Sequence, residues 1–255
     1  MKLTFLGTGT SKGVPEIGCT CPVCLSADER DKRLRVSALV ETDDTRILID
    51  CGPDFRIQML SVPFSRIDGV LLTHEHYDHT GGIDDLRPFC HFGDIDVFAD
   101  NLTCTHLRER LPYFFRKELY PGVPVLHFHV AEPCMPFSIN GVEVMPLQVM
   151  HGKLPILGYR IGKLGFVTDM TDAPDTTLEL LTGIDTLVIG ALRQRKHATH
   201  QTIDEAITIA RRLGARETYL IHMNHEAGLH AETDALLPDH VHLAYDGLVV
   251  KVENR

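Results

Sequence analysis

The 255-residue sequence lacks several features, and each absence excludes a class of protein. It contains no apolar run long enough to span a lipid bilayer. Residues 2–7 read directly as a strand and leave no room for the charged segment, apolar segment and cleavage site of a signal peptide. The seven cysteines are an odd number, which argues against a disulfide scaffold. We therefore expect a cytoplasmic protein that makes no contact with a membrane.

Positive charge is also scarce. The chain has 25 Lys and Arg residues against 35 Asp and Glu residues, which gives a formal net charge of −10. An acidic protein repels the phosphate backbone of nucleic acids unless its basic residues are gathered in one patch. The basic run 193–196 is a local exception. The charge balance argues against nucleic acid as a partner.

Short apolar runs alternate with amphipathic helical patterns, which predicts a layered α/β fold. No repeat, low-complexity stretch or linker divides the chain, so we expect one domain over residues 1–255. The clearest helix is 202–213, where Thr202 and Glu205 form a capping box and Gly214 supplies the stop. The expected strands are 2–7, 37–42, 46–50, 69–73, 142–149, 157–162, 165–169, 186–190 and 218–222.

Residues that can bind metals stand where four of these strands finish. His74, His151, Asp169 and His222 each end or follow an apolar run. This is the edge at which α/β folds usually place their sites. Rigid strands hold such side chains in place with little ordering cost on binding.

The run 74–79 (His-Glu-His-Tyr-Asp-His) places four potential metal ligands in six residues. Imidazole and carboxylate groups at this density suit Zn²⁺ or Mn²⁺. One ion cannot easily take all four ligands from so short a loop, so the spacing favours two neighbouring ions. A solvated polar turn is the alternative, but the apolar strand before the run and the glycine pair 81–82 after it favour a metal site.

A second cluster contains Cys19, Cys21 and Cys24 in the loop 18–25. Three thiolates that face one point make a good site for a structural Zn²⁺ and lack only a fourth ligand. His225 is the candidate, because it lies three residues beyond His222 on the loop that leaves the same strand. Three ordinary reduced cysteines remain the alternative.

The run 74–79 resembles the signature of the metallo-β-lactamase superfamily, and His151, Asp169 and His222 match its remaining ligand positions in order. The resemblance implies a four-layered αβ/βα sandwich. It also implies that Asp50 lies beside the histidine loop and steadies it. The implied ligands are His74, His76 and His151 for one ion and Asp78, His79 and His222 for a second, with Asp169 bridging the two.

The segments 6–15 (LGTGTSKGVP) and 18–24 (GCTCPVC) narrow the resemblance. Together with 151–154, 158–159, 222–225 and 245–247, they are similar to the phosphoribosyl 1,2-cyclic phosphate phosphodiesterases of the carbon–phosphorus lyase pathway. That family implies a cytosolic homodimer with two catalytic divalent ions and one structural zinc. The segment 84–124, with two possible helices and an aromatic run at 112–116, does not align with the family.

Members of that family use a histidine after the strand 186–190 as general acid, and His200 fits this role best. Asp78 joins His200 in the expected catalytic set. His197 is a candidate for orienting His200 or the substrate, and Lys153 and Arg193 are candidates for gripping a phosphate. The alternatives are a surface histidine that caps the next helix and ordinary solvated charges.

We therefore expect a hydrolase of small cyclic or nucleotide-like phosphodiesters, in which a metal-bridging hydroxide attacks and His200 protonates the leaving oxygen. Three alternatives stay open. One is a nuclease similar to those that process tRNA 3′ ends. Another is a thioesterase or lactonase that uses the same metals. The third is a non-catalytic metal-binding protein that has kept the fold.

Overall fold

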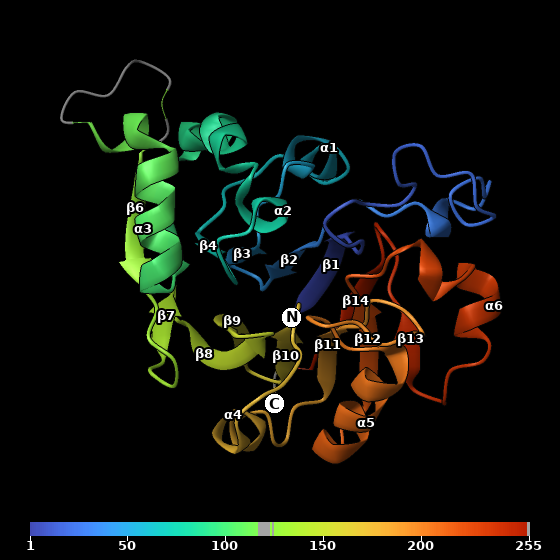
Figure 1. Cartoon of the computed structure of the whole chain (residues 1–255). Coiled ribbons are helices and arrows are strands. Elements are labelled where there is room, and N and C mark those ends of the chain that lie inside the picture. Colours follow the sequence, from blue (N-terminus) through green and yellow to red (C-terminus); the bar gives the residue numbers. More distant parts are fainter. Residues whose placement is uncertain (117–122, 124, 254–255) are drawn as a thin grey trace.

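The computed structural model of the chain describes residues 1–116, 123 and 125–253. Its strands form two seven-stranded sheets, which Figure 1 shows at the centre of the molecule. In spatial order, the first sheet contains β14 (Val249–Lys251), β1 (Lys2–Gly7), β2 (Ser37–Glu41), β3 (Arg46–Ile49), β4 (Gly69–Leu71), β5 (Ile95–Ala99) and β6 (Leu126–Val130). The second contains β13 (Val241–Leu243), β12 (Glu217–Ile221), β11 (Thr186–Gly190), β10 (Leu164–Val167), β9 (Leu154–Ile161), β8 (Val142–His151) and β7 (Phe137–Ile139).

Helices lie outside each sheet. The α-helices that follow strands of the first sheet are α1 (Phe55–Met59), α2 (Tyr77–Thr80) and α3 (Asn101–Arg110). Those that follow strands of the second are α4 (Asp175–Leu180), α5 (Ile203–Leu213) and α6 (His230–Asp234). Short 3₁₀ helices cover Glu29–Asp31, Ile83–Phe92, Pro112–Phe115 and His225–Ala227. None of the described helices is long and apolar enough to cross a bilayer.

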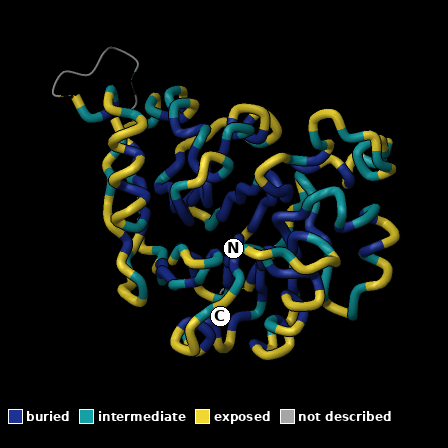
Figure 2. Tube along the Cα trace, viewed as in Figure 1, coloured by how far each residue is buried: buried dark blue, intermediate teal, exposed yellow. Residues whose placement is uncertain are grey.

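Three apolar cores separate four layers. The central core joins side chains of both sheets, such as Phe5 of β1 and Phe166 of β10. A second core packs α4 and α5 against the second sheet, and a third packs α1, Ile83–Phe92 and α3 against the first. Figure 2 shows the buried residues concentrated along the strands. The chain therefore has the predicted αβ/βα sandwich.

All nine expected strands and the expected helix are present, with ends that differ by at most three residues. The predicted capping box of α5 is also present, and Gly214 ends that helix with a φ of 65°. Five strands were not predicted: β5, β6, β7, β13 and β14. Of these, β7, β13 and β14 have three residues each and are too short to show a period.

The unaligned segment 84–124 contains both expected helical pieces, Ile83–Phe92 and α3, with β5 between them. In β5 and β6, polar residues interrupt the apolar run, because Asp96 and His127 lie on an exposed sheet face. The alternation in β6 could have been recognised as a strand signal. Residues 117–122 and 124, at the end of the segment, lie outside the described residues.

Three strands end on residues with left-handed backbone conformation. Asp50 follows β3 with a φ of 59°, Asp169 lies two residues after β10 with a φ of 54°, and His222 follows β12 with a φ of 59°. A non-glycine residue in this region costs about 1–2 kcal/mol. The predicted strands 46–50, 165–169 and 218–222 are therefore slightly too long, because the chain turns sharply at each of these polar residues.

Tyr159 links the two sheets just below the loop 74–79. Its side chain is fully buried, and its hydroxyl donates a hydrogen bond of 2.6 Å to the carbonyl oxygen of Leu72. Next to it, the amide of Leu157 donates to the carbonyl oxygen of Thr73 at 2.8 Å. These bonds fix the end of β4 against the second sheet.

We predict that Tyr159→Phe lowers the free energy of unfolding by about 1–3 kcal/mol, because the buried carbonyl of Leu72 loses its hydrogen-bond donor. Urea unfolding of the metal-free protein measures this. Tyr219→Phe is the matched control, since Tyr219 is only partly buried and packs its ring, which the substitution keeps, against Phe5. Equal effects of the two substitutions would show that the bond between the sheets contributes nothing.

Candidate metal centre

Seven predicted ligands from both sheets meet at one end of the sandwich. The structure forms compact groups in which one ligand atom from each residue lies within 4.8 Å of the others. These groups are His74 with His76 and His151, His74 with His79 and Asp169, Asp78 with His79 and His222, and His151 with Asp169 and His200. Every predicted ligand belongs to at least one of them. Asp169 shares one group with His74 and His79 and another with His151, so it lies next to members of both predicted ligand sets.

The histidines are held from outside the centre. His79 Nδ1 lies 2.7 Å from Asp50 Oδ2, His74 Nδ1 lies 3.0 Å from Thr73 Oγ1, and His151 Nδ1 lies 2.8 Å from the carbonyl oxygen of Thr199. A partner on the outer nitrogen fixes both the tautomer and the ring orientation of a metal-binding histidine. The opposite nitrogen of each ring is then left for the centre.

Several inward atoms lack a partner. Nε2 of His79 and both ring nitrogens of His222 are buried without a hydrogen bond to any described residue. His79 Nε2 nevertheless lies 3.2 Å from Asp78 Oδ2, and His222 Nε2 lies 3.1 Å from Asp169 Oδ1. Unsatisfied polar atoms in a protein interior are rare and costly. A cation placed between these nitrogens and carboxylates would satisfy both, so the residues fit a metal.

The charges of the centre also depend on one another. Although burial opposes both shifts, Asp50 and Asp78 raise the pKa of His79 well above its usual value, and His222 and His79 hold the pKa of Asp169 well below its usual range. Burial, with the nearby His79, lowers the pKa of His74. The raised pKa of His79 favours a proton on its ring, which helps to balance the buried carboxylates. Metal ions would compete with this proton, so metal binding should weaken as the pH falls.

Asp50 supports the loop 74–79 from beneath. The backbone amide of Thr73 donates to Asp50 Oδ1 at 2.8 Å, and the Thr73 hydroxyl donates to Asp50 Oδ2 at 2.9 Å. Two residues on, Gly52 lies so close to the loop that an added Cβ atom would lie 2.0 Å from the carbonyl oxygen of Asp78. The structure therefore places Asp50 beside the loop 74–79, as the family resemblance implies.

We predict that Asp50→Asn weakens zinc binding at the centre by roughly 10–100-fold, because His79 loses the carboxylate that orients it. Competition with a chelator measures the affinity. Asp96→Asn is the control, since it removes the carboxylate of an exposed Asp–His pair, in which the His129 Nε2 to Asp96 Oδ1 distance is also 2.7 Å. Unchanged affinity in Asp50→Asn would contradict the orienting role.

Helix α3 holds the same loop from outside. His106 forms an ion pair with Glu75, and Arg110 Nη2 donates to the hydroxyl of Thr80 at 2.8 Å and to its carbonyl oxygen at 3.1 Å. The Thr80 hydroxyl donates in turn to the carbonyl oxygen of His76 at 2.8 Å. No local sequence signal marks His106 or Arg110, because their partners are about 30 residues away in the chain.

The second predicted cluster is also assembled. Nδ1 of His225 lies 3.1 Å from Cys19 Sγ, 3.5 Å from Cys21 Sγ and 3.4 Å from Cys24 Sγ. Four ligands of this kind around one point match the donor set of a structural zinc site. All seven cysteines are free thiols, as expected for a chain without a disulfide scaffold.

We predict that Cys21→Ser releases about one zinc ion per chain and lowers the thermal unfolding temperature, because a structural zinc contributes folding free energy. Elemental analysis and calorimetry measure the two effects. Cys134→Ser, at an exposed thiol outside the cluster, should change neither. An unchanged zinc content in Cys21→Ser would leave the three thiols without a metal-binding role.

The predicted acid lies beside the centre. His200 Nδ1 is 3.6 Å from Asp169 Oδ1, and its ring stacks on that of His222 with centroids 4.8 Å apart. Burial and then the neighbouring His222 lower the pKa of His200 to about 3, so the ring is neutral at pH 7. The ring of His197 lies 5.1 Å from that of His200. The structure thus brings both predicted histidines to the centre.

The predicted phosphate-binding cations differ in their surroundings. Lys153 is exposed in the turn between β8 and β9, two residues after His151. Arg193, by contrast, forms an ion pair with Glu226, and Arg195 contacts the same carboxylate. Arg193 also donates to the carbonyl oxygens of Arg195 and Lys196. A phosphate would have to share the Arg193 guanidinium with these partners, whereas Lys153 is open to it.

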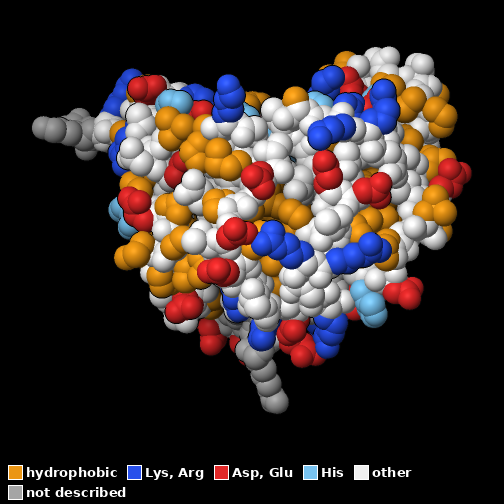
Figure 3. Space-filling model, turned by 60° about the horizontal axis from the view of Figure 1, so that its bottom comes forward, with side chains coloured by type: hydrophobic (Ala, Val, Ile, Leu, Met, Phe, Trp, Pro, Cys, Tyr) orange, Lys and Arg blue, Asp and Glu red, His pale blue; other side chains and the backbone are white. Residues whose placement is uncertain are grey.

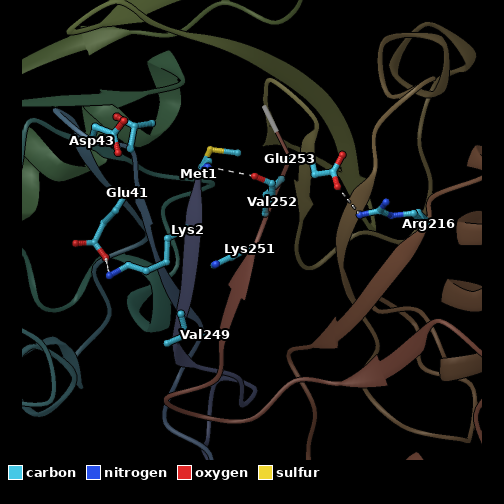
Figure 4. Close-up of a pocket in the computed structure, with 10 residues that line it drawn as sticks. Met1, Lys2, Glu41, Asp43, Arg216, Val249, Lys251, Val252 and Glu253 are labelled. Atoms are coloured by element: carbon cyan, nitrogen blue, oxygen red, sulfur yellow. Dashed lines mark hydrogen bonds and ion pairs between the residues drawn. The ribbon is translucent and has the colours of Figure 1, made fainter. Parts of the chain in front are cut away.

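A hollow of about 1040 Å³ lies at the opposite end of the sandwich. Its lining includes Lys2 and Arg216, which stand at the amino ends of β1 and β12, whereas the candidate ligands follow carboxyl ends. Figure 4 shows Lys2 paired with Glu41 and Arg216 paired with Glu253. On the face in Figure 3, the described basic and acidic side chains are interspersed. This hollow is therefore separate from the metal centre and balanced in charge.

Comparisons with known proteins agree with this geometry. Residues 45–223 match the family model of the β-lactamase superfamily domain. A crystal structure described as a new diphosphatase from the PhnP family is 38% identical, covers 98% of this chain and 96% of its own, and superposes with a TM-score of 0.91. Zn²⁺-bound PqqB from Methylobacterium extorquens shares the fold, with a TM-score of 0.80, 18% identity and coverage of 99% and 100% of the two chains.

The chain belongs to the metallo-β-lactamase superfamily and lies near the PhnP family within it. A curated relative from Porphyromonas gingivalis, named octanoyltransferase, is 48% identical over 257 residues. The match covers all of this chain but 52% of that protein. The chain thus spans about half the length of the first curated relatives that it matches.

Proposed function

We propose that the protein is a metal-dependent phosphodiesterase that hydrolyses small cyclic or nucleotide-like phosphodiesters. The observation that carries this proposal is the position of His200, an imidazole that lies against Asp169 but outside the two predicted ligand sets. Lys153 supplies an open positive charge near His151. A proton donor and a phosphate-binding cation beside a metal centre are what hydrolysis of a phosphodiester requires.

In this proposal, His74, His76 and His151 would hold one divalent ion, Asp78, His79 and His222 would hold a second, and Asp169 would serve both. Zn²⁺ and Mn²⁺ suit this mixture of imidazole and carboxylate ligands. Such ions, when bound, activate water at neutral pH and offset negative charge on the phosphoryl group. The thiolate-rich cluster of Cys19, Cys21, Cys24 and His225 holds a third ion, Zn²⁺, with a structural role.

The protein's own groups bind the substrate and move a proton. Hydrolysis adds a hydroxyl group to phosphorus and a proton to the departing oxygen, which leaves as an alcohol. The His200 ring is neutral in the free protein. In this proposal the negative charge of a bound phosphodiester raises its pKa, so that the ring takes up a proton and donates it to the departing oxygen. Lys153 contacts a phosphoryl oxygen, and the His197 ring beside His200 orients it or the substrate.

The similarity to a PhnP-family diphosphatase supports phosphoryl chemistry on a small substrate. One observation favours a second candidate, acyl transfer or thioester hydrolysis, because the 48% identical relative is named octanoyltransferase. That name describes a protein of which 48% lies outside the match.

A panel of cyclic phosphates, dinucleotides, diphosphates, RNA, lactones and octanoyl thioesters, with metal-defined protein, tests the proposal. Faster turnover of a thioester than of every phosphodiester would overturn it.

We predict that His200→Ala slows the hydrolysis of a phosphodiester with an alkoxide leaving group by roughly 10²–10⁴-fold, the usual contribution of a general acid. A p-nitrophenyl phosphodiester should lose much less activity, because a stable phenolate departs without a proton. Steady-state rates on the two substrates measure the difference, and elemental analysis should find the same metal content as in the wild type.

His74→Ala is the control variant, because damage to a metal ligand should depress both substrates together. Comparing two substrates on one variant cancels losses from folding. Equal losses on both esters in His200→Ala, or loss of a metal ion from it, would remove His200 from the acid role and favour its being a ligand with His151 and Asp169.

A further inference from the structure

The loop 193–200 between β11 and α5 contributes two groups to the surroundings of the metal centre. The carbonyl oxygen of Thr199 lies 2.8 Å from His151 Nδ1, and the side chain of His200 lies 3.6 Å from Asp169. The loop therefore orients one candidate ligand through its backbone and places an imidazole against another. Any movement of this loop would disturb both.

Within the described part of the chain, backbone–backbone hydrogen bonds fix only the ends of this loop. The amide of Leu192 donates to the carbonyl oxygen of Gln201 at 2.9 Å, and the amide of Ile203 donates to that of Arg193 at 3.1 Å. Between them the chain depends on side chains. Arg193 Nε donates to the carbonyl oxygen of Arg195 at 3.1 Å, and its Nη2 donates to that of Lys196 at 3.2 Å. The Arg193 guanidinium is thus one internal support of the loop, and the His197 ring, whose Nδ1 accepts a hydrogen bond of 3.3 Å from the Thr199 amide, is another.

Glu226 fixes that guanidinium in place. One carboxylate oxygen contacts Arg193 and the other contacts Arg195, so a single side chain holds two points of the loop. The Arg193 and Glu226 side chains are only 20% and 30% exposed, which reduces solvent screening of their ion pair, whereas Arg195 is 75% exposed. The Arg193–Glu226 contact should therefore contribute more than the Arg195–Glu226 contact to holding the loop in place.

Glu226 is itself anchored. Its amide donates to Asn224 Oδ1 at 2.8 Å, and it directly follows His225, whose imidazole faces the three cysteine thiols. A metal bound by those four residues would fix His225, and with it the short 3₁₀ helix His225–Ala227. The second cluster is thereby linked to the loop 193–200 by two consecutive residues.

We propose that Glu226 is a positioning residue, which uses the Cys19–Cys21–Cys24–His225 cluster as its platform and holds the loop 193–200 in the conformation that completes the metal centre. The inference rests on the proposed use of this centre to bind metal, and it assigns the second cluster a role beyond stability. Glu226 touches neither substrate nor metal in this arrangement and acts through Arg193.

Glu226→Gln in the full-length chain tests the proposal, because it keeps the size of the side chain and removes the charge that both guanidinium groups contact. We expect zinc affinity at the metal centre, measured by chelator competition without substrate, to fall by roughly tenfold or more, as for the loss of other groups that orient metal ligands. The visible absorption of cobalt bound to thiolates should show that the cysteine cluster still binds metal.

Glu253→Gln is the matched control. It breaks the exposed Arg216–Glu253 ion pair of 3.3 Å at the far end of the sandwich, and it should leave zinc affinity unchanged (Figure 4). Arg193→Met provides a second route to the same loss. If Glu226 acts through Arg193, the double variant should bind zinc no more weakly than the weaker single variant. Likewise, Cys21→Ser should lower the zinc affinity of the metal centre in the wild-type background. In the Glu226→Gln background the same substitution should lower it little further.

The proposal would be overturned if the Glu226→Gln variant bound zinc at the metal centre as tightly as the wild type. It would also be overturned if the losses of zinc affinity in Glu226→Gln and Arg193→Met simply added in the double variant, because each residue would then act alone. Loss of the cobalt–thiolate absorption in Glu226→Gln would also overturn it, because the cluster itself would then have failed. None of these measurements uses a substrate, so they are independent of whether His200 acts as a general acid.

Discussion

The burial of several charged and polar groups at the junction of two apolar sheets is the constraint on which the rest of this structure depends. Asp50, Asp169 and His79 are almost completely shielded from water. An isolated buried carboxylate is so costly that it must be paired, hydrogen-bonded or bound to a cation. The Thr73 and Thr168 hydroxyls and the His79 ring meet part of this need. Nε2 of His79 and the ring nitrogens of His222 have no hydrogen-bond partner among the described residues, which shows that protein groups meet only part of it.

The left-handed residues at the strand ends follow from the same constraint. A strand that continued in extended conformation past Ile49, Val167 or Ile221 would carry the next side chain along the sheet. A sharp turn at Asp169 and His222 directs their side chains into the ligand groups, and the turn at Asp50 directs its carboxylate to Thr73 and His79. Backbone strain of this kind persists only where the surroundings enforce it, and it gathers at functional sites. Three such residues around one centre therefore indicate a functional site, whether or not each of them binds a metal.

The sequence revealed those parts of the site whose signal is local. The spacing within 74–79, the three cysteines in six residues and the apolar run before each distant ligand can all be read along the chain. The supporting residues cannot be found in this way. Arg110, Thr199 and Glu226 act on partners 30, 48 and 33 residues away, and nothing in their neighbourhood distinguishes them from ordinary polar residues.

The same limit applies to the fold. Long apolar strands and the capped helix α5 were predictable, whereas the short outer strands depend on pairing with neighbours that are distant in the sequence. For Arg193, the sequence marked a cation in the basic run 193–196 but gave no sign of the carboxylate that contacts it. Charge complementarity between distant residues requires coordinates.

The positions of the candidate ligands also indicate which segments determine substrate specificity. His74, His76, Asp78 and His79 come from the first sheet, and His151, Asp169 and His222 come from the second, so a bound ion would join the two halves of the sandwich and contribute to folding. This requirement fixes the strand ends in any protein that uses the same centre. What remains free to vary are the segments that surround the centre: the cysteine loop 18–25, the helix α3 with the segment around it, and the loop 193–200. Differences in substrate among such proteins should therefore map to these three segments rather than to the sheets.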